Sequence, residues 1–327
     1  MEKISEKISG LIKEGKLDDA LEFAVNEAEK KPEVLSILND IGISLVEQQR
    51  FEEAEKIFNT IVEINPKEVE TWYNKGNALF NLMRYEEAIQ AYETVIAINP
   101  KDADAWYNKG NVLFNLKRYE EAIQAYGRAI AINPEDAGAW SNKGAARYYL
   151  KRYEEAIQAY GRAIEINPKH AGAWSNKGAA LFNLKRYEEA IQAYERAIAI
   201  NPEHADAWYN KGIALFDLKR YEEAIQAYER AIAINPEYTG AWNNKGIALF
   251  DLKRYEEAIQ AYETVIAINP EDADAWSNKG NVLSNLKRYE EAIQAYERAI
   301  AINPEHADAW YNKGIALFDL KRYEEAI

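Results

Sequence analysis

The sequence contains no cysteine, and only three histidines and two methionines, in 327 residues. Without cysteine the chain has neither a disulfide framework nor thiol chemistry. No apolar run is long enough to cross a membrane, and the first ten residues, MEKISEKISG, lack the apolar core of a secretory signal. We therefore expect a cytoplasmic protein that does not act at membranes.

The chain also has fewer basic than acidic residues. The 40 lysines and arginines are outnumbered by 54 aspartates and glutamates, which gives a formal net charge of -14. Nucleic acids bind proteins largely because lysine and arginine release counterions from phosphates, so we exclude a nucleic-acid partner. The same sign of charge favours basic protein partners.

Tryptophan and proline recur at a fixed interval of 34 residues. The eight tryptophans run from Trp72 to Trp310 and the nine prolines from Pro32 to Pro304, so every proline belongs to this period. A constant period of about 20 to 50 residues is typical of stacked supersecondary units. The fold of the chain is therefore mainly the fold of one repeat.

Counted from Met1, the period gives nine full units and a remainder of 21 residues. We interpret residues 1–34 as a degenerate N-terminal capping repeat and residues 307–327 as a truncated tenth repeat. The eight repeats predicted between them are 35–68, 69–102, 103–136, 137–170, 171–204, 205–238, 239–272 and 273–306.

Each unit contains two segments with apolar residues at helical spacing. In residues 205–238 these segments are ADAWYNKGIALFDL and YEEAIQAYERAIAI, joined by the letters KR and ended by NP. We predict an all-α fold of paired helices in which Gly212 and Ala224 let the two backbones approach closely, while Trp208 and Tyr228 fill the space around them. Such short helices must stack on neighbouring repeats to bury this surface.

These residues resemble the tetratricopeptide repeat (TPR) family. The matching positions in residues 205–238 are Trp208, Gly212, Leu215, Tyr221, Ala224, Tyr228, Ala231 and Pro236. The resemblance extends over the chain, with residues 1–34 matching loosely. It implies a right-handed superhelical solenoid whose first helices line a concave groove that holds a peptide segment of a partner protein. One departure is the lysine before each glycine, as at Lys211, which we expect to snorkel to the surface.

In the family, the second, fifth, ninth, twelfth and thirteenth residues of each repeat line the groove. We predict that a basic or mixed-charge peptide binds there, because these positions combine aromatic rings with carboxylates and amides. The alternative interpretation is that they are duplicated solvent-facing positions without a ligand. The candidate residues of this kind are Tyr73, Asn77, Phe80, Asp104, Tyr107, Asn111, Phe114, Phe182, Asp206, Tyr209, Phe216 and Asp217.

The asparagine at the sixth position of each repeat resembles the one with which family members grip a peptide backbone. The candidates of this kind are Asn108, Asn142, Asn176 and Asn210. An equally good interpretation is that these asparagines cap or bridge neighbouring helices. The lysines with which co-chaperone members of the family hold acidic C-termini are absent, so we exclude that class of partner.

Residues 138–153 depart from the sister repeats. Arg147 stands where they have leucine, and Tyr148 and Tyr149 stand where they have Phe-Asn or Phe-Asp. We predict that these three residues form an aromatic pocket for a side chain or carboxylate of the partner. Neutral drift in one copy accounts for the same letters, because arginine can bury its stem and keep its head in water.

Catalysis has almost no support in the sequence. The three histidines, His170, His204 and His306, each stand at the last residue of a repeat, too far apart to share a metal. No HExxH, GxGxxG or GxSxG motif and no phosphate loop occurs. We predict a non-enzymatic interaction scaffold with no cofactor and no metal.

The last residues, KRYEEAI, lead to two alternatives. In one, the chain is the recognition arm of a larger protein, truncated after residue 327. In the other, an uncapped C-terminal face supports homotypic end-to-end association, because near-identical repeats favour head-to-tail stacking or swapping.

Overall fold

The computed structural model describes residues 1–326, in which nineteen α-helices alternate with short turns and no strand occurs. The predicted all-α fold of helix-turn-helix repeats is confirmed. Within the described residues, no helix combines the length and the apolar character that crossing a membrane requires. The chain divides into two compact units, residues 1–167 and residues 168–327, and each is described by itself.

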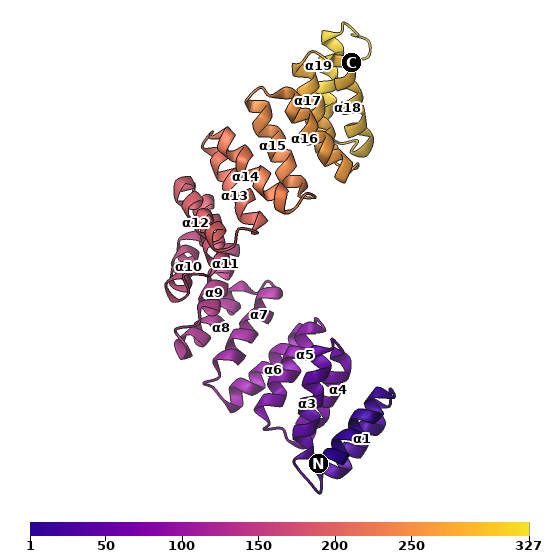
Figure 1. The fold of residues 1–327 in the computed structure, drawn as a ribbon, viewed down its shortest axis with the longest axis vertical. Helices are drawn as coiled ribbons and strands as arrows, with labels where there is room; N and C mark the ends of the chain where they lie inside the picture. The colour runs from indigo at the N-terminus through magenta and orange to yellow at the C-terminus, as the bar shows by residue number, and fades with distance from the viewer. Residues whose placement is uncertain (327) are drawn as a thin grey trace. The chain divides into compact units, whose positions relative to one another are not determined.

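Unit 1, residues 1–167, contains ten helices that follow one another as hairpins (Figure 1). Their bounds are α1 (Glu2–Lys13), α2 (Leu17–Ala28), α3 (Val34–Glu47), α4 (Phe51–Ile64), α5 (Val69–Asn81), α6 (Tyr85–Ile98), α7 (Ala103–Asn115), α8 (Tyr119–Ile132), α9 (Ala137–Tyr149) and α10 (Tyr153–Ile166).

Unit 2, residues 168–327, continues the same pattern in its described part. The helices are α11 (Ala171–Asn183), α12 (Tyr187–Ile200), α13 (Ala205–Asp217), α14 (Tyr221–Ile234), α15 (Thr239–Asp251), α16 (Tyr255–Ile268), α17 (Ala273–Asn285), α18 (Tyr289–Ile302) and α19 (Ala307–Asp319). From α5 onward, the first helix of each pair begins 34 residues after the previous one.

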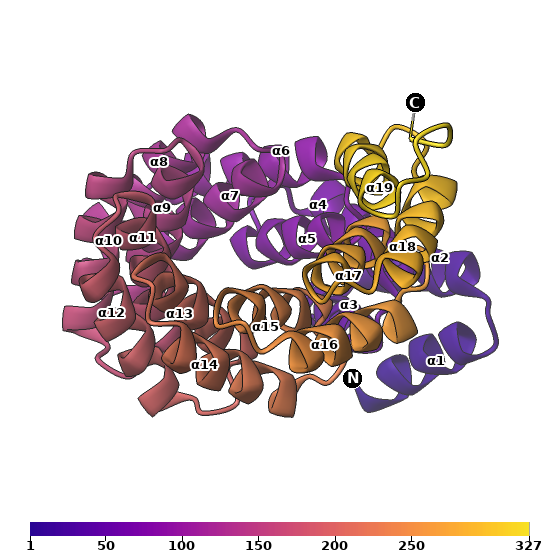
Figure 2. The same cartoon turned by 90° about the horizontal axis from the view of Figure 1, so that it is seen from above.

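The first helices of consecutive repeats lie next to each other in each unit. In unit 1, α7 contacts α9, and in unit 2, α13 contacts α15. The second helices form a separate layer, as Figure 2 shows for α14 and α16 beside α13 and α15. We call the surface built from the first helices, α3, α5, α7 and α9 in unit 1 and α11, α13, α15, α17 and α19 in unit 2, the groove face.

In each full repeat after the first, a ring from the second helix lies against the glycine of the first helix. A Cβ atom built on Gly212 would lie 2.5 Å from Cε1 of Tyr228, far inside normal contact. The closest such distance is 2.5 to 2.8 Å for the glycine at the eighth position of every repeat from 35–68 to 273–306. The predicted close approach at Gly212 is confirmed, and the tyrosine ring is the reason that no side chain fits there.

The turn between the two helices has an unusual backbone. The lysine at the fifteenth position of the repeat, such as Lys219, has a φ of 59°. Its amide N–H donates to the carbonyl of Phe216 at 2.8 Å, and that of Arg220 donates to the carbonyl of Leu215 at 2.9 Å. These two bonds form a Schellman motif, which ends the first helix. Lysine is uncommon in this left-handed region, so residue type alone does not predict the turn.

The tryptophan of each repeat lies at the junction with the preceding repeat. Trp208 packs against Ala197 and Ile198 of α12, and against Ala231 of its own second helix. The indole N–H of all eight tryptophans donates to the carbonyl of the preceding turn's proline, at 2.9 to 3.4 Å. The tryptophan ring therefore packs within its own repeat and also fixes the turn that joins it to the preceding repeat.

The lysine at the seventh position also joins neighbouring repeats. Lys211 Nζ lies 2.8 Å from Glu195 Oε1 of the preceding repeat and 5.6 Å from the centre of the Trp208 ring. The side chain of Lys211 is only 19% exposed. The stem of Lys211 is thus covered while its ammonium group meets Glu195, which is 52% exposed, and the indole face also attracts this group.

Candidate functional site

The predicted groove tyrosines of unit 1 lie on first helices and are half-buried, because each packs against a tyrosine of the second helix. The ring centres of Tyr73 and Tyr92 are 6.0 Å apart, and those of Tyr107 and Tyr126 are 5.9 Å apart. Burial raises the pKa of Tyr73, and the negative charge of Asp104 adds to this shift. One side of each ring therefore packs against the second helix, and the other side contributes to the groove face.

Asparagines link the first helices of unit 1 into a hydrogen-bonded row. Asn108 Nδ2 donates to the hydroxyl of Tyr73 at 2.7 Å, and Asn142 Nδ2 donates to that of Tyr107 at 3.0 Å. Asn142 also donates to Asn111 Oδ1 at 3.0 Å. The interpretation that these asparagines bridge neighbouring helices is confirmed for Asn108 and Asn142.

The ninth position supplies a second set of amides. Asn77 Oδ1 accepts from the hydroxyl of Tyr92 at 2.7 Å, and Asn111 Oδ1 accepts from that of Tyr126 at 2.9 Å. Because the buried tyrosine hydroxyl uses the oxygen, the amide nitrogen of each side chain is directed elsewhere. That of Asn111 donates to a neighbouring asparagine oxygen at 3.3 Å.

Two predicted asparagines lack such bridges. The side chains of Asn176 and Asn210 have no hydrogen-bond partner among residues 1–326. For Asn210 the cause is local, because Ser175 stands at the fifth position of the preceding repeat, where a tyrosine hydroxyl would otherwise accept. Both amides are free to meet a ligand.

Two other predicted residues of unit 2, Tyr209 and Asp206, both contact Tyr238. The ring of Tyr209 lies 4.8 Å from that of Tyr238, whose hydroxyl donates to Asp206 at 2.9 Å. Burial raises the pKa of Tyr209. The carboxylates of Asp206 and Asp217 are exposed, as is that of Asp104 in unit 1.

The phenylalanines at the twelfth position lie beside the turn of their own repeat. Phe80, Phe182 and Phe216 each pack against the tyrosine that begins the second helix, with ring centres 5.2 to 5.7 Å apart. Each of these phenylalanines is half-buried. They form an aromatic edge to the groove face.

Five aromatic residues meet at this edge in unit 1. We call them the Tyr149 cluster, and its members are Phe114, Tyr119, Tyr148, Tyr149 and Tyr153. Tyr149 stacks on Tyr119, with ring centres 5.1 Å apart and an interplanar angle of 8°, and meets Phe114 edge-on at 5.4 Å. Tyr148 contacts both Tyr149 and Tyr153. Tyr149 remains 57% exposed.

Sequence reasoning found Phe114, Tyr148 and Tyr149 but missed Tyr119 and Tyr153. The missed residues are the first residues of the second helices, α8 and α10. The available signal was the short turn, which places the first residue of a second helix beside the last turn of the first helix.

Arg147 does not take part in this cluster. Its Nη1 donates to the carbonyl of Glu155 at 3.2 Å, and its Nε lies 3.5 Å from Glu155 Oε2. The side chain is 17% exposed. The charge of Arg147 therefore already faces a carboxylate of α10.

The groove face of unit 2 contains a hollow that sequence reasoning did not find. It has a volume of about 470 Å³ and lies over α15, α17 and α19. Ser284 stands there at the twelfth position, where most sister repeats have phenylalanine. The replacement of a phenylalanine by serine at this position was the feature of the sequence that could have indicated the hollow.

An exposed apolar surface covers one side of α19. Its largest side chains are Trp310, Tyr311 and Phe318, which are 52%, 70% and 61% exposed. We call these three residues the α19 face. Gly314 lies among them without the ring that covers the corresponding glycines of other repeats.

The histidines have structural contacts. Nδ1 of His170 accepts the amide N–H of Ala173 at 3.2 Å, and Nδ1 of His306 accepts that of Ala309 at 3.3 Å. Each ring thus caps the helix that follows it. Among residues 1–326, no three histidine, aspartate or glutamate side chains are grouped as a metal site would require.

Family models described as tetratricopeptide repeat match this chain over most of its length. They match residues 39–103, 73–137, 137–170, 171–204, 205–238, 227–260, 273–306 and 295–327, and a model described as TPR repeat matches residues 246–287. The chain belongs to the tetratricopeptide repeat family. TPR proteins are generally non-enzymatic, and the chain is a protein-interaction scaffold in this general sense.

Solved structures agree with this assignment. The chain is similar to YrrB, described as a TPR protein with an unusual peptide-binding site, at 28% identity and a TM-score of 0.52, over 58% of this chain and 98% of that one. A chain of the APC/C hetero-tetramer Cut9-Hcn1 is 20% identical with a TM-score of 0.55, over 93% of this chain and 60% of that one, which bears on the fold alone. No curated protein sequence matches the chain.

Proposed function

We propose that the TPR chain binds a basic peptide segment of a partner protein on the groove face of unit 1, with the Tyr149 cluster as its main contact. The observation that carries the proposal is the exposed face of Tyr149, held rigid by stacking on Tyr119 at 5.1 Å. A rigid aromatic face attracts a lysine or arginine side chain through the ring quadrupole.

The protein already uses this contact internally. The lysine of each repeat from 69–102 onward lies 4.7 to 5.7 Å from the centre of its tryptophan ring. No cation of residues 1–326 lies over the ring of Tyr149. The exposed carboxylate of Asp104 and the net charge of -14 both favour a cationic ligand. The similarity to YrrB, whose description names a peptide-binding site, adds support for a peptide.

Selection from a phage-displayed library of random 12-residue peptides tests this function. We expect the enriched peptides to contain lysine or arginine, and we expect Tyr149→Asn to weaken their binding about fivefold, as loss of an exposed cation–π contact would. Isothermal titration calorimetry of one resynthesised peptide, and of its version with glutamine at each basic position, measures both effects.

Gln158→Ala is the matched control, because Gln158 is exposed on α10, a second helix of the same unit. It should leave the affinity unchanged. Enrichment of acidic peptides, or equal affinity of wild type and Tyr149→Asn, would contradict the proposal.

We propose a second function, self-association through the α19 face, because three large apolar side chains are exposed together there. The outer surface of α1 is charged, with Lys3, Glu6 and Lys7 exposed, so two α19 faces match each other better than head-to-tail stacking does. Light scattering should show concentration-dependent dimers of the wild-type chain that Phe318→Asp abolishes. A monomer at all concentrations, or dimers that survive Phe318→Asp, would refute this function.

A further inference from the structure

Among the repeats from residue 69 onward, one lacks an aromatic pair that the others share. In seven repeats, the aromatic residue at the twelfth position contacts the tyrosine at the seventeenth position, with ring centres 5.2 to 5.7 Å apart. In residues 273–306 these positions are Ser284 and Tyr289, so Tyr289 has no such ring beside it. The missing ring leaves space on the groove face.

The comparison with α7 isolates the cause. Residues 108–115 read NKGNVLFN and residues 278–285 read NKGNVLSN, so the two stretches differ only at Phe114 and Ser284. In α7 the ring of Phe114 lies 5.3 Å from that of Tyr119. In α17 the serine borders the hollow of about 470 Å³. A volume of this size is typical of small-ligand sites and admits a ring together with its peptide backbone.

The walls of the hollow are neutral. Its apolar side is formed by Ile247, Phe250 and Ile315, and no charged side chain lines it. A charged group of a ligand would therefore lose its hydration without gaining a counter-charge. An aromatic side chain, in contrast, would meet the apolar walls of the hollow.

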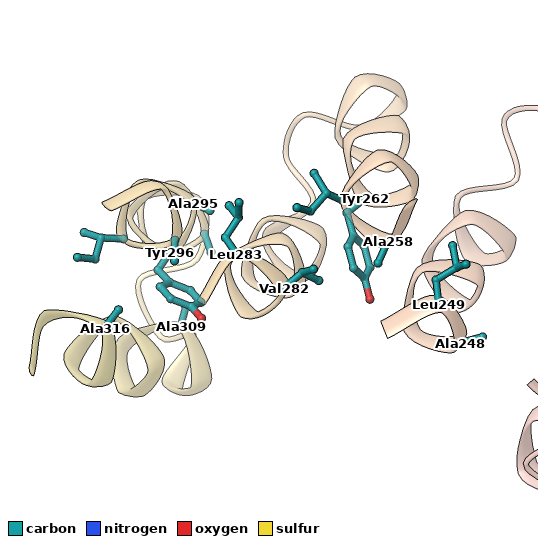
Figure 3. Close-up of a cluster of buried hydrophobic side chains, with 14 of the residues drawn as sticks. Ala248, Leu249, Ala258, Tyr262, Val282, Leu283, Ala295, Tyr296, Ala309 and Ala316 are labelled. Atoms are coloured by element: carbon teal, nitrogen blue, oxygen red, sulfur yellow. The ribbon is translucent and has the colours of Figure 1, made fainter. Parts of the chain in front are cut away.

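The amides around the hollow are oriented by buried contacts. Asn281 Oδ1 accepts from the hydroxyl of Tyr296 and from Nδ2 of Asn312, each at 2.9 Å. Burial raises the pKa of Tyr296 to about 12, so its hydroxyl keeps the proton that it donates at neutral pH. Figure 3 shows Tyr262 and Tyr296 pointing inward from α16 and α18 among the core side chains. Asn281 Oδ1 thus accepts two hydrogen bonds, and its Nδ2 remains available as a donor.

A donor and an acceptor remain open at the site. Among residues 1–326, neither Asn281 Nδ2 nor Asn278 Oδ1 has a hydrogen-bond partner, while Asn278 Nδ2 donates to Asn243 Oδ1 at 3.3 Å. A peptide group offers one carbonyl and one N–H, which pair with this donor and this acceptor.

We infer that the Ser284 hollow binds an aromatic side chain of a partner peptide, and that Asn281 and Asn278 hydrogen-bond the backbone beside that side chain. The partner supplies the ring that the repeat lacks. This inference deepens the proposed peptide-binding function, although it rests on a site in unit 2, separate from the Tyr149 cluster in unit 1.

The probe is acetyl-Gly-Gly-Phe-Gly-Gly-amide with fluorine on the ring, observed by fluorine NMR with the full chain. We expect line broadening with the wild type, about fivefold tighter binding than the leucine analogue in competition, and no binding to Ser284→Phe, whose new ring fills the hollow. Asn281→Leu should weaken binding, since it removes the open donor.

Lys287→Ala is the control, because Lys287 is exposed in the following turn and does not line the hollow. Equal binding to Ser284→Phe, equal affinity for the leucine analogue, or no binding to the wild type would overturn the inference. Circular dichroism melts confirm that Ser284→Phe folds, as a repeat with the Phe114 arrangement should. Failure at Tyr149 with success here would refute only the basic-peptide proposal, and the reverse result would refute only this inference.

Discussion

Alanine at Gly144 will destabilise unit 1 by about 2 to 3 kcal/mol, whereas alanine at Gly161 will stabilise it by about 1 kcal/mol. A Cβ atom on Gly144 would lie 2.8 Å from Cε1 of Tyr160, and that ring is 1% exposed and has no room to move. The new methyl group must therefore push the two helices of the repeat apart.

Gly161 lies inside α10, and a Cβ atom there would meet nothing within 4 Å. Alanine at this site gains helix propensity without a clash. Urea denaturation midpoints of the two variants against wild type measure both effects. Tyr160→Leu combined with Gly144→Ala should recover part of the loss, because the ring is removed. Two variants that shift the midpoint in the same direction would contradict this view of the repeat.

Replacing Arg147 with leucine will raise the stability of unit 1 by about 1 to 2 kcal/mol. The Nε atom of Arg147 is buried without a hydrogen-bond partner. Leucine at the same position in sister repeats, such as Leu181 and Leu215, is 2% exposed. The substitution removes a buried Nε that has no hydrogen bond and restores an apolar contact, while Glu155 keeps Arg152 as a partner at 2.6 Å.

The control for this prediction is Arg152→Leu, which removes a more exposed ion pair and should change the stability by less than about 1 kcal/mol. Both variants can be compared by thermal and urea denaturation. A lower midpoint for Arg147→Leu would show that the arginine is a stabilising residue. The contacts of Arg147 with Glu155 would then contribute more to stability than the apolar contact of a leucine.

The helix pairs were predictable from the sequence because their signals are local and repeated. The apolar spacing, the proline after each second helix and the glycine at each crossing all act within one repeat, and the 34-residue period shows them many times. The contact of Gly212 with Tyr228 follows from the same local geometry.

Contacts between repeats were harder to predict. The partner of Lys211 was not predicted, because Glu195 belongs to the previous repeat and only the stacking of repeats brings the two side chains within 2.8 Å. Arg147 was predicted to lie in the groove. Sister repeats have a buried leucine at this position, however, and such a position faces the core. The same rule, applied to the sequence, would have placed its side chain correctly.

The Ser284 hollow was missed for a different reason. The residues predicted from the sequence, such as Tyr148 and Tyr149, add aromatic rings to the surface, whereas this site arises from a side chain that is absent. A smaller residue at a position filled by a ring in sister repeats is itself a signal of a cavity.

Photo-crosslinking of a selected basic peptide tests the central claim that first helices form the binding surface. Ala145→p-benzoylphenylalanine places a reactive group on α9, one turn from Tyr149 on the same face, and Gln158→p-benzoylphenylalanine places it on α10. We predict that the peptide crosslinks to the Ala145 variant and not to the Gln158 variant. Crosslinking at Gln158 with none at Ala145 would contradict the account, because it would place the peptide on the second helices.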